Sequence, residues 1–174
     1  MTNKIIITGT ESTGKTELIQ QLAAHYHVPF LPDYSRIYIE QLNRPYREED
    51  VLEIARCIIE EEEKLQYSGG EFFISDNDLI NIKIWLQYYD WNVPRWLEEA
   101  IGQHKAQIYL LCDIDLPWVA DEQRANPHDR KELLQRFVSE LSNISANFHL
   151  IKGTNQQRLH SAVEVVDGFL RSQE

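Results

Sequence analysis

The segment Gly9–Thr16 constrains the fold of this chain more than any other part of the sequence. Its residues, GTESTGKT, fit the pattern G-x-x-x-x-G-K-[ST] at every specified position. An apolar run, Lys4–Thr8, comes directly before it, and a helical pattern, Lys15–His25, begins at its end. The two glycines allow the backbone to turn so that successive N–H groups point inward, toward a phosphate at the helix N-terminus. The sequence therefore predicts a strand, a phosphate-binding loop and a helix, in that order.

The same loop supplies most of the candidate ATP-binding residues. Lys15 would place a point charge on the β- and γ-phosphate oxygens, and the Thr16 hydroxyl is a candidate ligand of Mg²⁺, which prefers oxygen. The guanine-reading sequence N-K-x-D occurs nowhere, so ATP is the expected nucleotide. Gly153 and Asn155 follow the last apolar run, where they either pass beside adenine or form a plain turn. The candidate ATP-binding residues are Gly9, Thr10, Glu11, Ser12, Thr13, Gly14, Lys15, Thr16, Gly153 and Asn155.

Short apolar runs alternate with longer helical patterns along the chain. The expected strands are Lys4–Thr8, Val28–Pro32, Glu71–Ser75, Gln107–Cys112 and Phe148–Lys152. The expected helices are Lys15–His25, Glu48–Tyr67, Leu79–Tyr89, Arg95–His104, Arg130–Asn143 and Gln156–Ser172. Nearly continuous hydrophobicity is typical of strands buried on both faces, and the alternation indicates right-handed crossovers between parallel strands. The sequence predicts an α/β fold with a central five-stranded parallel sheet and helices on both faces.

Length and charge limit the expected partners. The 174 residues suit one domain, taken as residues 1–174, and 17 Lys and Arg against 28 Asp and Glu give a formal net charge of −11. So acidic a chain is not expected to bind nucleic acid or an anionic membrane through its overall field, and any phosphate must be held by local donors. We see no signal-peptide pattern and no apolar stretch of about 18 residues, which predicts a cytoplasmic protein.

Carboxylates follow two of the expected strands. Asp76 comes after the third strand and is the candidate for the shell of the metal, while Asp78 either points to the substrate or caps the next helix. Asp33 follows the second strand, and ligands of open α/β sheets bind beyond the carboxyl ends of the strands. We therefore expect Asp33 to bind an acceptor hydroxyl and take its proton. Arg36 would hold phosphate, or pair with Asp33 in a purely structural role.

A polar segment, Asp121–Arg130, lies between the exit of the fourth strand and the next helix. It carries Arg124 and Arg130, and it has the character of a lid whose arginines stabilise the charge that develops in phosphoryl transfer. The alternative is a surface loop with solvated arginines.

Aromatic residues are candidates to stack on a flat acceptor ring. Tyr34 and Trp118 leave the ends of expected strands, and Trp85 lies on the helix that follows Asp78. For Trp85 and Trp118 a place in the core is an equally good interpretation, and for Trp91 and Trp96 it is the better one.

Together these residues resemble the ribosylnicotinamide kinase domain of NadR-type NAD-biosynthesis proteins. The resemblance runs from the first expected strand to the last helix, and it implies the three-layer P-loop kinase fold. The segments that carry it are the loop Gly9–Thr16, Asp33-Tyr34-Ser35-Arg36 leading into Tyr38-Ile39-Glu40, residues 73–79, Leu110-Leu111-Cys112-Asp113-x-Asp115-x-Pro117-Trp118-x-x-Asp121, and Ile151-x-Gly153 followed by Arg158.

The resemblance implies transfer of the ATP γ-phosphate, with Mg²⁺, to the 5′-hydroxyl of nicotinamide riboside, giving nicotinamide mononucleotide. The candidate catalytic residues are Lys15, Asp33, Arg124 and Arg130. The candidate substrate-binding residues are Asp33, Tyr34, Arg36, Asp78, Trp85, Trp118 and Asp121, and the candidate metal ligands are Thr16 and Asp76. ATP and nicotinamide riboside are the expected partners.

Two positions depart from the family pattern. Asn77 stands where a small hydroxyl residue is usual, and Glu122 stands where a glycine is common. These departures leave open a kinase of another nucleoside or small metabolite, and a regulatory ATPase is a further alternative. Family members usually also carry a DNA-binding and an adenylyltransferase domain, and we expect this chain to be a kinase without them.

Overall fold

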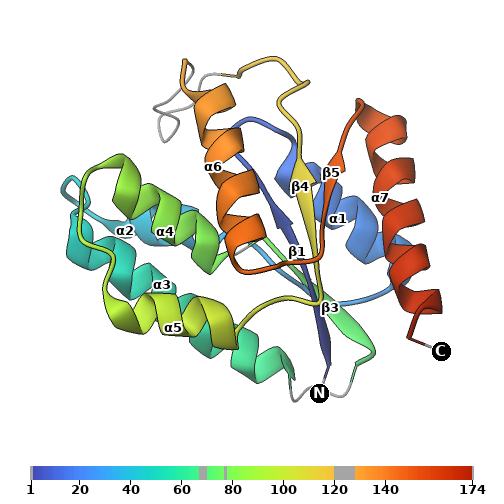
Figure 1. Cartoon of the computed structure of the whole chain (residues 1–174), viewed down its shortest axis with the longest axis horizontal. Coiled ribbons are helices and arrows are strands. Elements are labelled where there is room, and N and C mark those ends of the chain that lie inside the picture. The colour runs from blue at the N-terminus through green and yellow to red at the C-terminus, as the bar shows by residue number, and fades with distance from the viewer. Residues whose placement is uncertain (1, 67–69, 77, 120–127, 174) are drawn as a thin grey trace.

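The computed structural model describes residues 2–66, 70–76, 78–119 and 128–173. Five parallel strands form one sheet in the order β2-β3-β1-β4-β5, with helices on both faces (Figure 1). The strands are β1 (Asn3–Thr8), β2 (Phe30–Leu31), β3 (Phe72–Ser75), β4 (Ile108–Cys112) and β5 (Phe148–Ile151). The helices are α1 (Lys15–Tyr26), α2 (Tyr34–Gln41), α3 (Glu48–Gln66), α4 (Leu79–Tyr88), α5 (Arg95–Gln103), α6 (Arg130–Asn143) and α7 (Asn155–Arg171). The predicted α/β fold with a five-stranded parallel sheet is confirmed.

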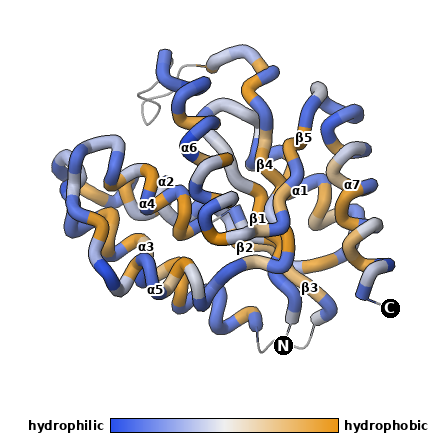
Figure 2. The backbone as a smooth tube through the Cα atoms, viewed as in Figure 1, coloured by the Kyte–Doolittle hydropathy of each residue, from blue (hydrophilic) through white to orange (hydrophobic). Residues whose placement is uncertain are grey.

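The three inner strands form the most buried part of the molecule. In the parallel register Ile5 of β1 lies between Ile74 of β3 and Ile108 of β4, and all three side chains are buried. These strands have a neighbour at each edge and helices over each face, which explains their nearly continuous apolar sequences. Hydrophobic residues accordingly concentrate in the central strands (Figure 2). The edge strand β5 is more open, with Leu150 40% exposed.

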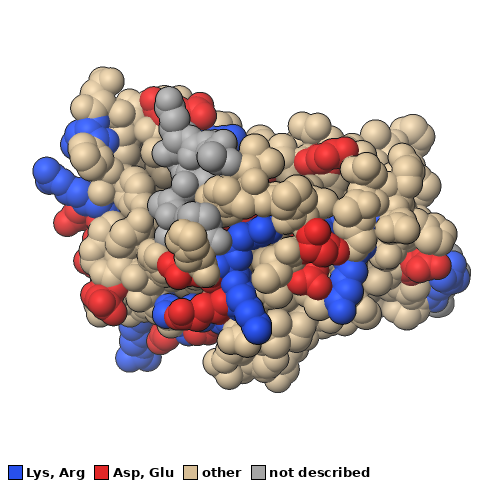
Figure 3. Space-filling model, turned by 90° about the horizontal axis from the view of Figure 1, so that it is seen from above, with Lys and Arg blue, Asp and Glu red and all other residues tan. Residues whose placement is uncertain are grey.

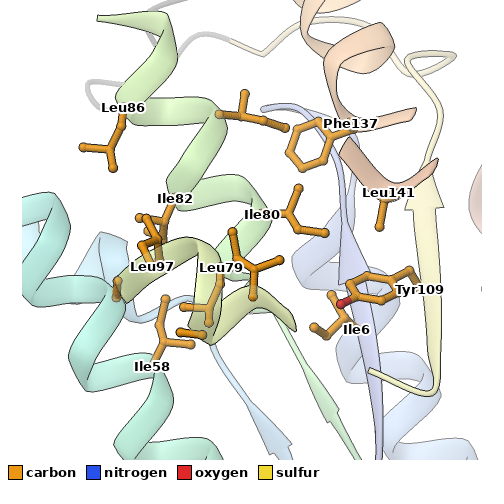
Figure 4. Close-up of a cluster of buried hydrophobic side chains, with 14 of the residues drawn as sticks. Ile6, Ile58, Leu79, Ile80, Ile82, Leu86, Leu97, Tyr109, Phe137 and Leu141 are labelled. Atoms are coloured by element: carbon orange, nitrogen blue, oxygen red, sulfur yellow. The ribbon is translucent and has the colours of Figure 1, made fainter. Parts of the chain in front are cut away.

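Two apolar layers enclose the sheet. On one face α1 and α7 pack through side chains such as Leu22 and Val166. On the other face α3, α4, α5 and α6 converge on the sheet, where Ile80, Phe137 and Tyr109 meet (Figure 4). This second layer leaves the carboxyl ends of the strands accessible between α4, α6 and the loop after β1.

The edge of the sheet that β2 forms differs from the prediction. The expected strand Val28–Pro32 is reduced to Phe30–Leu31, because it pairs with β3 alone and two prolines border it. The helix α2 was not predicted. None of its residues is fully buried, and Tyr34, Tyr38 and Ile39 pack against the core only in part, so the helix has a weak apolar signal in the sequence. Asp33 starts this helix as its N-cap, accepting a hydrogen bond from the Ser35 N–H.

A buried ion pair lies near the amino end of β1, whereas the loop Gly9–Thr16 follows the carboxyl end of the same strand. Lys4 Nζ lies 2.7 Å from Glu62 Oε2 of α3, and both side chains are almost fully buried. Burial raises the pKa of Glu62 to about 7, although the neighbouring Lys4 charge opposes that shift.

Within the residues that the structure describes, no helix is both long enough and apolar enough to cross a membrane.

Candidate active site

A cavity of about 530 Å³ lies at the carboxyl edge of the sheet. The loop after β1, the start of α2 and the inner faces of α4 and α6 surround it. Its lining residues are Gly9, Thr10, Glu11, Ser12, Thr13, Gly14, Lys15, Thr16, Glu17, Asp33, Ser35, Arg36, Ile39, Tyr46, Asp76, Asn81, Ile84, Trp85, Tyr88, Tyr89, Leu133 and Phe137. One space therefore joins the phosphate-binding motif to the segment predicted to hold an acceptor.

The phosphate loop requires its glycines. Gly9 has φ +135° and Gly14 has φ +74°, backbone conformations that residues with a Cβ rarely adopt. A Cβ on Gly14 would also lie 2.9 Å from Leu116 Cδ1. Lys15 bends back over the loop, and its Nζ donates to the carbonyls of Gly9 at 2.9 Å and Thr10 at 2.7 Å. The charge of Lys15 is thus held within the loop whose N–H groups form the phosphate cradle.

Asp76 and Thr16 lie together where a metal was predicted. The Thr16 hydroxyl donates to Asp76 Oδ2 at 3.5 Å, and burial raises the pKa of Asp76 to about 7. Oδ1 of Asp76 is buried and makes no hydrogen bond within the described residues. A carboxylate oxygen without a partner beside a hydroxyl fits Mg²⁺, which takes few protein ligands and completes its shell with water and phosphate oxygens. The described residues include no cluster of three or more His, Cys, Asp or Glu side chains around a metal position.

Asp33 lines the cavity while it caps α2. Its Oδ1 accepts hydrogen bonds from the Ser35 N–H at 3.0 Å and from the Ser35 hydroxyl. Arg36 lines the cavity too, and both groups are close enough to Asp76 to influence its pKa. Tyr34 does not line the cavity: it lies beside Tyr38, with ring centroids 6.2 Å apart, and a hydrogen bond with Cys57 raises its pKa to about 12.

Aromatic side chains form the far wall of the cavity. Tyr46 meets Trp85 edge to face, with ring centroids 5.1 Å apart, and its hydroxyl lies 2.9 Å from that of Tyr89. Trp85 and Tyr88 both line the cavity, and stacking of Trp85 on an acceptor stays a prediction. Sequence reasoning missed Tyr46, which follows a proline outside any periodic pattern and gives no local signal of its position.

Arg130 lies behind the phosphate loop. Its guanidinium donates to the carbonyl of Leu116 at 3.0 Å and to that of Ser12 at 3.1 Å, and its Cζ lies 5.9 Å from the centroid of the Trp118 ring. Neither Arg130 nor Trp118 lines the cavity. The other predicted residues of this segment, Arg124 and Asp121, lie outside the described residues, as do Asn77 and Glu122.

Three further predicted residues also lie away from the cavity. Asp78 is buried and caps α4, accepting from the Ile80 N–H at 2.9 Å, which is the structural alternative of the sequence analysis. Gly153 and Asn155 form the turn between β5 and α7, both with positive φ. The Gly153 N–H donates to Asp115 Oδ2 at 2.5 Å.

Charges of both signs lie on the face that includes the carboxyl edge. Figure 3, seen from above, shows Lys and Arg side chains beside Asp and Glu. Local cations such as Lys15 and Arg36 are present at the cavity, as phosphate binding by an acidic chain requires.

The strand order, the glycine loop and the cavity beside it define a P-loop kinase fold with three layers. A family model described as an AAA domain matches residues 4–158. The chain belongs to this family.

Curated relatives extend the comparison. The trifunctional NAD biosynthesis/regulator protein NadR of Salmonella typhimurium is 22% identical over 178 residues, covering 97% of this chain and 43% of that protein. NadR of Escherichia coli matches with the same identity and coverage. The chain thus spans less than half the length of these relatives, and the resemblance to NadR-type proteins is confirmed at this level.

Solved structures agree on the fold. A NadR protein in complex with NR superimposes with a TM-score of 0.79 and 17% identity, over 97% of this chain and 50% of that one. Thymidylate kinase from Ehrlichia chaffeensis superimposes with a TM-score of 0.69 and 11% identity, over 95% of this chain and 98% of that one. These likenesses show that the chain shares its fold with both proteins.

Proposed function

We propose that this protein is an ATP-dependent kinase that phosphorylates the 5′-hydroxyl of nicotinamide riboside, giving nicotinamide mononucleotide and ADP. The observation that carries the proposal is the shared cavity, in which the loop Gly9–Thr16 faces a wall of aromatic and carboxylate side chains. The NadR relatives, one of them solved with NR, support nicotinamide riboside as the acceptor.

The nucleotide would lie along the β1, β4 and β5 side of the edge. N–H groups of the phosphate loop and the Lys15 ammonium group would bind the β- and γ-phosphates. The turn with Gly153 and Asn155 lies at the end of β5, the place that the sequence indicates for the base. A Mg²⁺ ion bound with ATP would be held by Thr16 and Asp76 and would neutralise phosphate charge.

In the transfer step Asp33 would accept the proton of the 5′-hydroxyl. The hydroxyl oxygen then forms a bond to the γ-phosphorus while the bond from that phosphorus to the β–γ bridging oxygen breaks, and ADP leaves with the electron pair. Arg124, on the segment predicted to form a lid, would stabilise the charge on the transferred group. Arg130 would support the phosphate loop from behind, through the carbonyls of Leu116 and Ser12. Arg36 would hold phosphate oxygens at the same end of the cavity.

The aromatic wall suits the cationic pyridinium ring of this acceptor. Cations bind over the faces of Trp and Tyr rings, and Trp85, Tyr46 and Tyr89 offer such rings to the cavity. Glu11 adds a carboxylate on the same side, near enough to Tyr46 to raise its pKa. A neutral nucleoside would gain less from these groups than a cationic one.

A coupled ADP-release assay tests the proposal. We expect turnover that depends on nicotinamide riboside, with nicotinamide mononucleotide detected by mass spectrometry. Thymidine, deoxyadenosine and a reaction without acceptor are run beside it, with Lys15→Ala as the inactive control. Turnover with another nucleoside but not with nicotinamide riboside would show that the other nucleoside is the acceptor. ADP release independent of any acceptor would favour the regulatory ATPase.

A further inference from the structure

Arg158, on the first turns of α7, is a buried cation outside the cavity. The residue is 3% exposed. Its Nε donates to the Gly153 carbonyl at 2.9 Å, one terminal nitrogen donates to the Thr13 carbonyl, and the other donates to the Asp113 carbonyl at 3.3 Å and to the Asp115 carboxylate. Most of its N–H donors are thus used, and its charge is matched by Asp115.

These contacts connect three segments that are far apart in the sequence. Thr13 belongs to the loop after β1, Asp113 and Asp115 follow β4, and Gly153 follows β5. The ion pair of Arg158 and Asp115 also binds both backbone groups of Gly153. The Gly153 N–H donates to Asp115, and the Gly153 carbonyl accepts from Arg158. One guanidinium therefore fixes the turn after β5 relative to the phosphate loop.

The contact with the Thr13 carbonyl also sets the direction of the Gly14 N–H in the phosphate loop. In a trans peptide, the carbonyl of one residue and the N–H of the next point in opposite directions. Because Arg158 holds the Thr13 carbonyl, the Gly14 N–H points away from the guanidinium. Gly14 itself lines the cavity, and an added Cβ there would face Leu116 and the Arg158 nitrogen on the outer side of the loop.

We propose that Arg158 is a positioning residue for the nucleotide: it orients the Thr13–Gly14 peptide for phosphate and fixes the turn at Gly153 relative to it. The proposal rests on the proposed function, in so far as this site binds ATP. Arg158 does not line the cavity. Because its contacts reach the phosphate loop and the turn at Gly153, its effect is on how the nucleotide is held rather than on the acceptor.

The test compares Arg158→Met and Arg158→Lys with Arg171→Met, an exposed arginine at the other end of the same helix. Calorimetry gives the Kd of ATP and of ADP without acceptor, the ADP-release assay gives KM for both substrates, and thermal melting reports folding. We expect Arg158→Met to raise the Kd and KM of ATP at least about tenfold. Arg158→Lys should recover only part of that loss, since an ammonium group lacks the planar fork. The KM of the acceptor should stay within about twofold, and Arg171→Met should match the parent.

A merely structural role gives a different result. A protein that is only destabilised would show lower kcat and melting temperature with the parental KM for ATP, and that outcome overturns the proposal. If Arg158→Met does not fold, Asp115→Asn provides the test, because its side chain is 30% exposed and the amide keeps an acceptor. We expect a Kd for ATP raised about threefold or more, and an unchanged Kd overturns the proposal. A parent that binds ATP without phosphorylating nicotinamide riboside would defeat the proposed acceptor and leave this test intact.

Discussion

The two sides of the cavity are held by different kinds of contact. The side formed by the loop Gly9–Thr16 is the proposed nucleotide side. There guanidinium groups donate to main-chain carbonyls, Arg158 to that of Thr13 and Arg130 to that of Ser12. On the acceptor side the wall consists of side chains, with Trp85 and Tyr46 edge to face and Asp33 at the start of an exposed helix. Main-chain contacts define a shape that many sequences can form, whereas side-chain contacts depend on identity. The fold therefore indicates where a nucleotide would bind, whereas the identity of the acceptor has to be tested by substitution and assay.

The largest expected effect comes from removing the cation of the nucleotide side. Lys15→Ala should lower kcat/KM by about 10³–10⁵-fold, the range for loss of a charge that stabilises phosphoryl transfer. Steady-state ADP release measures it. Lys131→Ala, on the exposed first turn of α6, removes the same charge from this acidic chain and should keep parental turnover. Activity retained in Lys15→Ala would contradict the phosphate-binding role of the loop.

On the acceptor side the largest effect should come from Asp33. Asp33→Asn should lower kcat by about 10²–10⁴-fold if this carboxylate takes the hydroxyl proton. Asparagine is a good N-cap, so α2 and the melting temperature should be preserved. Pre-steady-state and steady-state rates separate the chemical step from binding. An effect confined to the KM of the acceptor would make Asp33 a binding residue instead.

A smaller effect is expected from the aromatic wall. Trp85→Leu should raise the KM of nicotinamide riboside about three- to tenfold, the size of an aromatic or cation–π contact, and leave the KM of ATP unchanged. Trp96→Leu is the matched control, since Trp96 lies under Arg56 on α5 and does not line the cavity. If both variants change the acceptor KM equally, the wall does not select the ring.

The smallest effect on catalysis is expected at Glu62, which does not line the cavity, so that a change there should alter the free energy of unfolding alone. The pKa of Glu62 is raised by burial from an ordinary value near 4.5 to about 7, so the folded protein binds a proton that the unfolded chain releases. Stability should therefore fall as pH rises from about 4.5 to about 7, by at most about 1.4 kcal/mol per pH unit.

Thermal melts of the parent and of Glu62→Gln across this pH range measure that contribution. The variant should lose this part of the slope, while Glu60→Gln, on an exposed position of α3, should behave as the parent does. Equal slopes for parent and Glu62→Gln would show that Glu62 does not titrate in this range. Neither variant should change the KM of ATP or of the acceptor.

Local signals explain what the sequence could predict. The phosphate loop is encoded by glycines that need positive φ, and the inner strands are encoded by continuous apolar runs, so both were found at nearly correct bounds. Asp33 and Asp76 were placed by a rule of topology, that ligands bind at the carboxyl ends of parallel strands.

The rest depends on contacts between distant segments. Tyr46, just before α3, and Asn81, on α4, line the same cavity, and α3 and α4 pack against each other. No spacing in the sequence indicates that arrangement. No local pattern indicates the role of Arg158, because its side-chain partners lie 5 to 145 positions away. Trp118 shows that the topological rule can also mislead. It follows the end of a strand, yet its ring lies beside Arg130 and does not line the cavity.

The exposure of α2 has a consequence for local unfolding. With no fully buried residue and a neighbouring strand of two residues, this helix can open at a lower free energy than the sheet beside it. Its packing on the core is limited to the partly buried side chains Tyr34, Tyr38 and Ile39. An acceptor bound against α2 would supply contacts that folding alone leaves unmade, and part of its binding free energy would be spent on ordering that helix.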